Sequence, residues 1–248
     1  MKNRLAIVTG GTSNIGLEVV KIFLKRNIDV ALVGSSTKSV KEALANVNKE
    51  QFEANLHGFD CDLSASSNIN TLIENVINRF KRIDIIVNSA GMLDLSDIEN
   101  TSEETWDTVQ AVNLKAPFFI IQKSLDYLKK SNCARIVNIS SNAGRMGGYA
   151  NGMSYSASKG GLISLTYGLA RKLAKYEITV NCVAPGTIES NMLSARDNKT
   201  KLKLLENFPV GRFGKPNEVA EAVFYFVKES SGFTTGTVLD VNGGMFTG

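Results

Sequence analysis

Residues 154–159 read Ser-Tyr-Ser-Ala-Ser-Lys, which places a phenol four residues before an ammonium group. Residues four apart lie on one face of a helix, so Lys159 can sit beside Tyr155 if this segment is helical. A free tyrosine titrates near pH ~10, and a neighbouring buried cation lowers that pKa. With the hydroxyl of Ser141 nearby, the pair predicts a group that gives or takes a proton near neutral pH. A surface Tyr and Lys at helical spacing is the alternative reading of the pair alone.

A glycine-rich turn stands near the start of the chain. Leu5–Val8 is a short apolar run of strand type, and residues 17–24 carry apolar side chains at helical spacing. Between them, residues 9–16 read Thr-Gly-Gly-Thr-Ser-Asn-Ile-Gly. Such a turn lets the backbone approach a pyrophosphate while the N–H groups of the next helix face the anion. We expect a dinucleotide-binding turn here, although a glycine-rich turn alone is often only a tight connection.

Five ordered motifs make the chain resemble the short-chain dehydrogenase/reductase family over essentially its whole length. The family's Thr-Gly-x-x-x-Gly-x-Gly turn corresponds to residues 9–16, and its Asn-Asn-Ala-Gly motif corresponds to residues 88–91. Its catalytic Asn corresponds to Asn113, and its Ser, Tyr and Lys correspond to Ser141, Tyr155 and Lys159. Its Pro-Gly-x-Ile-x-Thr motif corresponds to residues 185–190. Within the family, residues 209–216 and 241–246 look most like those of 3-oxoacyl-acyl-carrier-protein reductases.

The chain departs from the family pattern at four places. Asn14 replaces the middle glycine of the turn, and asparagine tolerates a positive φ better than most residues do. Ser89 replaces the second Asn, and Ser190 replaces Thr but keeps the hydroxyl. The interval from Ser141 to Tyr155 is one residue longer than usual, and its glycines can absorb an insertion in a loop.

The resemblance implies a role for each matching residue. Ser141 and Tyr155 would hydrogen-bond the substrate carbonyl, Tyr155 would donate the proton, Lys159 would hold the cofactor ribose, and Asn113 would anchor a water chain that resupplies the proton. Without the resemblance, Asn113 is an ordinary polar residue in a helix and 88–91 an ordinary strand-end turn. The implied cofactor contacts are Gly10, Thr12, Ser13, Asn14, Ile15, Gly16, Asn88, Ala90, Gly91, Tyr155, Lys159, Pro185, Gly186, Ile188 and Ser190.

The choice between NAD(H) and NADP(H) depends on the end of the second strand. An NAD site usually carries an acid there, roughly 20 residues after the glycine turn. No carboxylate occurs between Asp29 and Glu42, and Ser35, Ser36 and Lys38 offer donors for a 2′-phosphate, so we favour NADP(H). Ser13 lacks the basic side chain that many NADP enzymes of the family carry in the turn. Asp62, with Leu63, resembles the family's adenine contact, and a helix N-terminal carboxylate is the alternative.

Strand-like and helix-like segments alternate along the chain, which predicts an α/β, Rossmann-like doubly wound parallel sheet of about seven strands with helices on both faces. Helix starts are expected at Ser64, Ser102 and Pro216, the last helix running to Lys228. Ligands of such sheets bind at the carboxyl ends of the strands, where the motif residues fall. The expected strands are Leu5–Thr9, Val30–Val33, Leu56–Phe59, Ile83–Asn88, Arg135–Ser140, Thr179–Val183 and Val238–Val241.

Composition excludes several classes of protein. A chain of 248 residues with 43% hydrophobic residues is long enough for one large domain, taken here as 1–248. The single His57 argues against a His-based triad or a metal site, and we expect it to be structural. We expect a cytoplasmic protein, because the three cysteines are isolated and there is no room before the first strand for a secretory signal. We expect no membrane span, because no apolar run approaches ~20 residues. The net charge of +4 is spread along the chain, with no nucleic-acid motif.

The substrate is the least determined feature. Residues 187–215 are expected to form a lid, because Leu202, Leu204, Leu205 and Phe208 follow a helical apolar pattern. A 3-oxoacyl thioester on acyl carrier protein is favoured. Residues 92–97 do not match that subfamily, so a sugar, steroid-like or simple alcohol/ketone dehydrogenase is the alternative. A non-catalytic dinucleotide sensor is a third possibility, against which the intact Ser, Tyr and Lys speak.

Two partner surfaces are expected. Family members are commonly homotetramers, and apolar helix faces at Phe118, Phe119, Ile120, Leu165 and Leu169 could supply the interface, with burial in the chain's own core as the alternative. An acidic carrier protein could be steered by cations near predicted helix ends, namely Lys129, Lys130, Arg171, Lys172 and Lys175.

Overall fold

A computed structural model describes residues 4–47, 50–148, 151–190, 193 and 198–248. Its centre is a seven-stranded sheet in which each strand runs parallel to its neighbours, in the order β3-β2-β1-β4-β5-β6-β7. The fold class expected from the sequence is therefore confirmed. The strands are β1 (Leu5–Thr9), β2 (Asp29–Gly34), β3 (Leu56–Asp60), β4 (Ile85–Asn88), β5 (Arg135–Ile139), β6 (Thr179–Pro185) and β7 (Val238–Val241).

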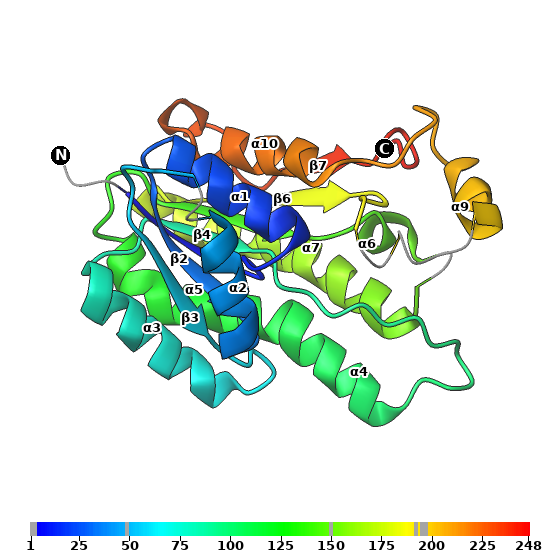
Figure 1. Ribbon diagram of the computed structural model, residues 1–248, viewed down its shortest axis with the longest axis horizontal. Helices are drawn as coiled ribbons and strands as arrows, with labels where there is room; N and C mark the ends of the chain where they lie inside the picture. Colours follow the sequence, from blue (N-terminus) through cyan, green and yellow to red (C-terminus); the bar gives the residue numbers. More distant parts are fainter. Residues whose placement is uncertain (1–3, 48–49, 149–150, 191–192, 194–197) are drawn as a thin grey trace.

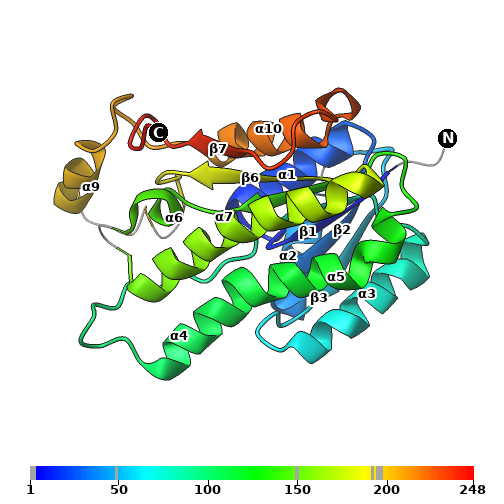
Figure 2. The ribbon, with the colours of Figure 1, turned by 180° about the vertical axis from the view of Figure 1, so that it is seen from behind.

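The central strands are buried on both faces, which explains why they read as continuous apolar runs. In β1, Leu5 and Ile7 join one hydrophobic cluster, whereas Ala6 and Val8 join the other. One cluster is completed by α1 (Asn14–Lys25), α2 (Thr37–Val47) and α10 (Pro216–Val227). The other is completed by α3 (Ser66–Phe80), α5 (Ala116–Leu128) and α7 (Met153–Leu173). Helices thus cover both faces of the sheet (Figures 1 and 2).

Shorter elements complete the described chain. The helix α4 continues through a π-helical turn, η1, directly into α5, because the three elements follow one another without a break. No helix in the described ranges is both long and apolar enough to cross a bilayer. These remaining elements are α4 (Glu103–Gln110), η1 (Ala111–Lys115), α6 (Ala143–Met146), η2 (Ala174–Tyr176), α9 (Asn198–Leu205) and η3 (Glu229–Ser231).

Element ends differ from the predictions by one or two residues. The fourth strand begins at Ile85 and not at Ile83, and just before it the Asp84 carboxylate accepts a hydrogen bond from the backbone N–H of Leu5 (2.8 Å). The helix expected after Ser64 begins at Ser66 with Ala65 as its N-cap, since Ser64 is held by the Asp62 carboxylate. The other differences are that β2 starts at Asp29 and ends at Gly34, β3 ends at Asp60, β5 at Ile139, β6 at Pro185 and α10 at Val227.

The Ser102 N-cap is present as predicted, with its Oγ accepting a hydrogen bond from the N–H of Thr105 (3.1 Å). In the expected lid, Ile188 forms an isolated bridge with Gly214, and α9 lies at the end of the molecule toward which β6 points (Figure 1). Residues 191–192 and 194–197 of that region lie outside the described part. Lid behaviour stays a prediction.

The helix face expected to form an interface is partly used by the chain itself. Ile120 is fully buried in the cluster around α3 and α5, so it is not available to a partner. Phe119 and Leu169 are partly buried and pack against the same cluster. Phe118 is 36% exposed, which leaves it as the most accessible aromatic residue of the expected set.

Candidate active site

The turn after β1 is held against the turn after β4. Thr9 Oγ1 accepts hydrogen bonds from the backbone N–H groups of Ser89 and Ala90, both at 3.1 Å. Asn14 begins α1 with φ +47°, a left-handed conformation that asparagine tolerates. Gly16 must be glycine, because an added Cβ would lie 2.1 Å from the Gly10 carbonyl oxygen. The backbone at the start of α1 is therefore close-packed and points free N–H groups out of the helix.

A cavity of about 320 Å³ opens beside this turn. Residues of the glycine turn and of the start of α7 line it, and Lys159 is among them. A glycine turn at a helix N-terminus, continuous with a buried cation and a phenol, fits a dinucleotide with its phosphates on α1. Of the residues expected to bind the cofactor, the cavity is lined by Gly10, Ser13, Asn14, Ile15, Gly16, Ala90, Gly91, Tyr155, Lys159, Pro185, Gly186, Ile188 and Ser190.

The remaining expected cofactor contacts do not line this cavity. Asn88 is buried, and its Nδ2 donates to Asn138 Oδ1 on β5 (2.8 Å), so it braces the strands beneath the turn. Thr12 packs close to Gly34 at the end of β2. The others, Ser35, Ser36, Lys38, Asp62 and Leu63, belong to the segments after β2 and β3.

The segment after β2 forms the first turn of α2. Ser36 Oγ accepts from the N–H of Ser39 (3.2 Å), and Lys38 is exposed in that turn. The register of the sheet sets Asp60 opposite Gly34, and the Asp60 carboxylate accepts from Thr37 Oγ1 (3.2 Å). A carboxylate therefore stands next to the segment that the sequence shows as free of acids. Asp62 binds the N–H and Oγ of Ser64, and its pKa is lowered by the backbone hydrogen bond first and the hydroxyl second.

A second cavity, of about 210 Å³, adjoins the first. Ser141 and Tyr155 line both cavities, as does Leu93. A molecule in the second cavity would thus contact the same hydroxyl groups that line the first. The rest of its lining includes apolar side chains, amides and two further hydroxyl groups, among them Met146, Ile188, Leu193, Leu204 and Met245, Asn142, Asn151 and Asn207, and Thr187 and Ser190.

The phenol and the ammonium group are near each other without being hydrogen-bonded. Lys159 Nζ lies 5.8 Å from the centroid of the Tyr155 ring and donates to the Ile139 carbonyl oxygen (2.8 Å). Burial raises the pKa of Tyr155, and a hydrogen bond with Ser141 lowers it by less. The expected lowering of this pKa by Lys159 is therefore wrong for the cofactor-free chain. The same burial lowers the pKa of Lys159 to about 8.

Asn113 lies in the π-helical turn η1, fully buried. Its Oδ1 accepts from the N–H of Met92 (2.7 Å), while its Nδ2 donates to the Met92 carbonyl (2.9 Å) and to Ser158 Oγ (3.0 Å). Both amide hydrogens are consequently used within the protein. This leaves a lone pair of Oδ1 and the backbone of the turn as positions for water.

Several residues that line the two cavities were not predicted from the sequence. Asn142 follows Ser141 directly, and its Oδ1 accepts from Ser141 Oγ (3.0 Å). Its Nδ2 contacts Met245 Sδ at 2.8 Å, which ties the C-terminal segment to the cavity wall. A polar residue next to the strand-end serine was the available signal for Asn142. Nothing in the sequence pattern marks Leu93.

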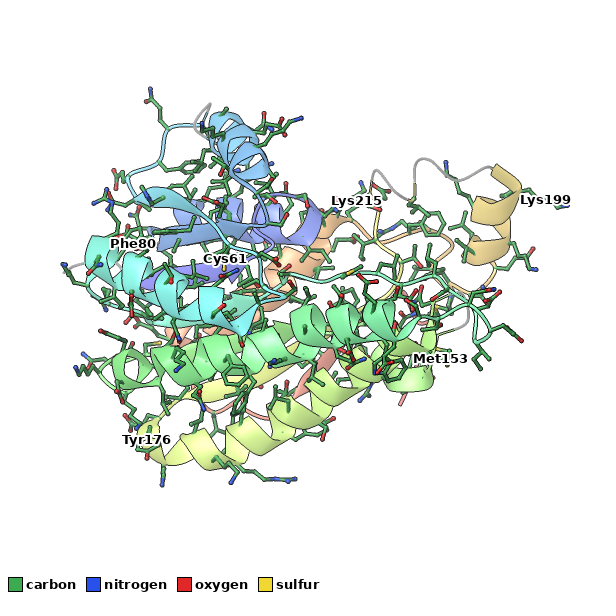
Figure 3. All side chains as sticks on the ribbon, turned by 90° about the horizontal axis from the view of Figure 1, so that it is seen from below. Cys61, Phe80, Met153, Tyr176, Lys199 and Lys215 are labelled. Atoms are coloured by element: carbon green, nitrogen blue, oxygen red, sulfur yellow. The ribbon has the colours of Figure 1, made fainter. Side chains whose placement is uncertain are left out.

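The basic residues expected to steer a carrier protein lie away from these cavities. Lys172 follows Tyr155 by 17 positions on the same helix, a rise of about 25 Å. Figure 3 shows Met153 and Tyr176 at opposite ends of this helical segment. The Nζ of Lys129 lies 4.6 Å from the Tyr176 ring centroid, so the basic ends of α5 and α7 are neighbours. Within one chain, this cluster does not border the candidate active site.

The sheet is parallel with helices on both faces, and a glycine turn follows its first strand. Ser141 and Tyr155 line both cavities, and Lys159 lines the one beside the glycine turn. These features define a nicotinamide-dependent oxidoreductase. The family model described as short chain dehydrogenase matches residues 4–201. The chain belongs to this family of enzymes, which act on CH–OH and C=O groups with a nicotinamide cofactor.

Curated relatives match over nearly the full chain. A 3-oxoacyl-[acyl-carrier-protein] reductase of Aquifex aeolicus is 36% identical, covering 99% of this chain and 98% of its own. A protein of the same name from Thermotoga maritima is 33% identical, with coverage of 99% and 98%. The (2S)-[(R)-hydroxy(phenyl)methyl]succinyl-CoA dehydrogenase subunit BbsD of Thauera aromatica is 34% identical, with coverage of 98% and 97%.

Proposed function

We propose that this chain is an NADP(H)-dependent reductase of 3-oxoacyl thioesters, carried on acyl carrier protein, in fatty acid synthesis. The observation that carries the proposal is that Ser141 and Tyr155 line both cavities, so their hydroxyls stand between a cofactor site and a substrate site. The thioester is supported by the names of the relatives, two of which are acyl-carrier-protein reductases and one a succinyl-CoA dehydrogenase subunit.

Each residue has a separate task in the proposed reaction. When bound, the nicotinamide supplies the hydride for the carbonyl carbon. Ser141 Oγ and the Tyr155 hydroxyl donate hydrogen bonds to the carbonyl oxygen, and Tyr155 passes its proton to the alkoxide that develops there. A raised pKa keeps the phenol of Tyr155 protonated in the cofactor-free chain, which suits a proton donor.

Lys159 and Asn113 act behind the phenol. The ammonium group of Lys159 borders the cofactor cavity, where it would hold the ribose and, once the cofactor is bound, lower the pKa of Tyr155. Water that resupplies the proton would bind at the free lone pair of Asn113 Oδ1 or at the backbone of η1. The Asn113 side chain also fixes Met92, so it has a structural task as well.

The preference for NADP(H) rests on the first turn of α2. Lys38 and the N-terminus of the eleven-residue helix α2 supply positive potential there, which suits a 2′-phosphate. Asp60 opposes this charge through its contact with Thr37. The preference is therefore a balance between one ammonium and one carboxylate, and both can be removed separately.

We further propose a homotetramer in the cytoplasm, with residues 187–215 closing over the substrate. The exposed Phe118 supports an interface on α5, and the free thiols Cys61, Cys133 and Cys182 support a reducing compartment. Leu204 and Asn207 support the lid, since both line the substrate cavity from α9 and its end. Sedimentation of the wild type and of Phe118→Asp tests the homotetramer, and the variant is expected to form smaller particles.

The alternative substrate classes, a sugar, a steroid-like molecule or a simple ketone, keep one observation in their favour. Asn142, Asn151 and Asn207 place three amides around the substrate cavity, and amides suit a substrate rich in hydroxyl groups. Turnover of a panel of thioesters, sugars and ketones by NADPH separates the classes. Tyr155→Phe serves as the matched inactive control.

A further inference from the structure

Asp94 is a buried carboxylate in the segment between β4 and α4. It is 6% exposed, and both of its carboxylate oxygens are hydrogen-bonded. Oδ1 accepts from the N–H (2.9 Å) and the Oγ (2.5 Å) of Ser96, and Oδ2 accepts from Ser154 Oγ (2.5 Å). None of the ion pairs among the described residues includes Asp94. Its partners are therefore hydroxyl and backbone groups alone.

These contacts anchor the first turn of the helix that carries Tyr155. The N-cap of α7 is Gly152, which has no side chain with which to cap the helix. Its N–H donates instead to the Asp94 carbonyl oxygen (2.8 Å). A Cβ at Gly152 would lie 2.1 Å from Asp94 Oδ2, so the carboxylate occupies the space where a capping side chain would stand. A negative charge at a helix N-terminus is favourable to the helix.

The same segment is fixed at a second point. Asn113 binds the backbone N–H and carbonyl of Met92, two residues before Asp94. Leu93 lies between the two anchored residues, and its side chain lines both the cofactor cavity and the substrate cavity. The Asp94 contacts therefore hold the first turn of α7, just before Tyr155, and the backbone that follows Leu93.

We propose that Asp94 is a positioning residue, which through Ser154 sets the phenol of Tyr155 and through its own backbone sets the wall at Leu93. It touches neither cavity itself and transfers no proton. The inference rests on the oxidoreductase class of the chain and not on the thioester substrate. A displacement of about 1 Å at a reacting group can slow an enzyme by about 100-fold.

Asp94→Asn, Ser154→Ala and the double variant test this role. Each single variant is expected to lower kcat by about 10- to 100-fold, while the dissociation constant for NADPH changes by less than about twofold. The double variant should be no slower than the slower single variant, because both single variants disrupt the same Asp94–Ser154 contact. Ser154→Thr, which keeps the hydroxyl, should retain most of the wild-type kcat. Asp97→Asn is the matched control, since Asp97 lies in the same segment but caps an exposed turn at Asn100.

The rates are measured with acetoacetyl thioester and with simple ketones and sugars, and compared on whichever compound the wild type reduces. Failure of the wild type on thioesters alone contradicts the proposed substrate, not this inference. The inference is overturned if Asp94→Asn and Ser154→Ala keep kcat within twofold of wild type. It is also overturned if Ser154→Thr is as slow as Ser154→Ala, or if the loss of rate follows a loss of NADPH binding. If Asp94→Asn does not fold, Ser154→Ala and Ser154→Thr decide the question.

Discussion

The Nζ of Lys159 lies 5.8 Å from the ring centroid of Tyr155 and donates its hydrogen bond to the Ile139 carbonyl oxygen at 2.8 Å. In the cofactor-free chain the two residues are therefore neighbours that do not share a proton. Burial raises the pKa of the phenol and lowers the pKa of the ammonium group to about 8. Each group has a polar partner of its own, the Ile139 carbonyl for Lys159 and the Ser141 hydroxyl for Tyr155.

The depressed pKa of Lys159 predicts a pH dependence of cofactor affinity. Below pH 8 Lys159 is an ammonium and can hold the ribose; as the pH rises above 8 it loses its proton. The dissociation constant for NADPH should therefore be nearly constant up to about pH 7, about double by pH 8, where half of the ammonium is lost, and then rise by up to about tenfold per pH unit. Fluorescence titration of NADPH between pH 7 and 9.5 measures this. Lys159→Arg should bind more weakly but with a flat profile, and a flat wild-type profile would contradict the role of Lys159.

Variants of the candidate active site should separate chemistry from binding. Tyr155→Phe is expected to abolish turnover and leave NADPH binding unchanged, because only the proton donor is lost. Ser141→Ala should lower kcat by about 100-fold or more, as for loss of an oxyanion donor. Lys159→Ala should harm both turnover and binding. Steady-state rates and NADPH titrations measure the two effects, and substantial activity in Tyr155→Phe would show the acid/base assignment to be wrong.

Cofactor choice should follow the charges around α2. NADPH is expected to bind more tightly than NADH, and Lys38→Ala should weaken NADPH much more than NADH. Asp60→Asn should act in the opposite direction and strengthen NADPH, because it removes a carboxylate held near Thr37. Lys41→Ala, in the same helix and also exposed, is the control. Titration of both cofactors measures the ratio, and an equal or tighter affinity for NADH in the wild type contradicts the proposal.

Asp84 should be important for stability and not for activity. Its carboxylate accepts from Leu5 N, Arg82 and Ser131 at the amino end of the sheet. Asp84→Ala should lower the free energy of unfolding by about 2–3 kcal/mol, because the buried N–H of Leu5 loses its partner. The exposed Asp126→Ala should change it by less than about 0.5 kcal/mol. Urea unfolding at neutral pH measures both.

The contribution of the Asp84 carboxylate to the free energy of unfolding should depend on pH. Burial alone would raise the pKa of Asp84, but hydrogen bonds from Arg82, Ser131 and Leu5 lower it overall. A lowered pKa in the folded state stabilises the protein above the unfolded value of about 3.9 and loses this effect as the pH falls through the folded value. The difference between wild type and Asp84→Ala should therefore shrink below pH 4. A difference that stayed constant into acid would contradict the assignment.

Much of the fold was predictable because the strands are buried on both faces. Apolar runs such as Leu5–Val8 can be recognised as strands by their hydrophobicity, and their alternation with helices implies the parallel sheet. The far position of Lys172 and Lys175 was also predictable. Both precede β6, and residues just before a strand of such a sheet lie at its amino end, away from the ligand.

Other features depend on contacts that no local pattern contains. Asp94 meets Ser154 across 60 residues of sequence, and Asp60 meets Thr37 through the register of two parallel strands. The pKa of Tyr155 was predicted in the wrong direction because helical spacing gives proximity to Lys159 but not the strength of burial. Desolvation is the largest cause of the shift in the cofactor-free chain.

The most direct test of the proposed function is NADPH oxidation, followed by absorbance, with acetoacetyl thioesters on CoA and on acyl carrier protein beside sugars, steroid-like ketones and simple ketones. The proposed function predicts that the thioesters are turned over fastest and that Tyr155→Phe turns over none of the substrates. The rate on the carrier-bound substrate should fall from low to moderate ionic strength, because a charged surface encounter is screened over ~10 Å at 0.1 M salt. Good turnover of a sugar or simple ketone, with no turnover of any thioester, would contradict it.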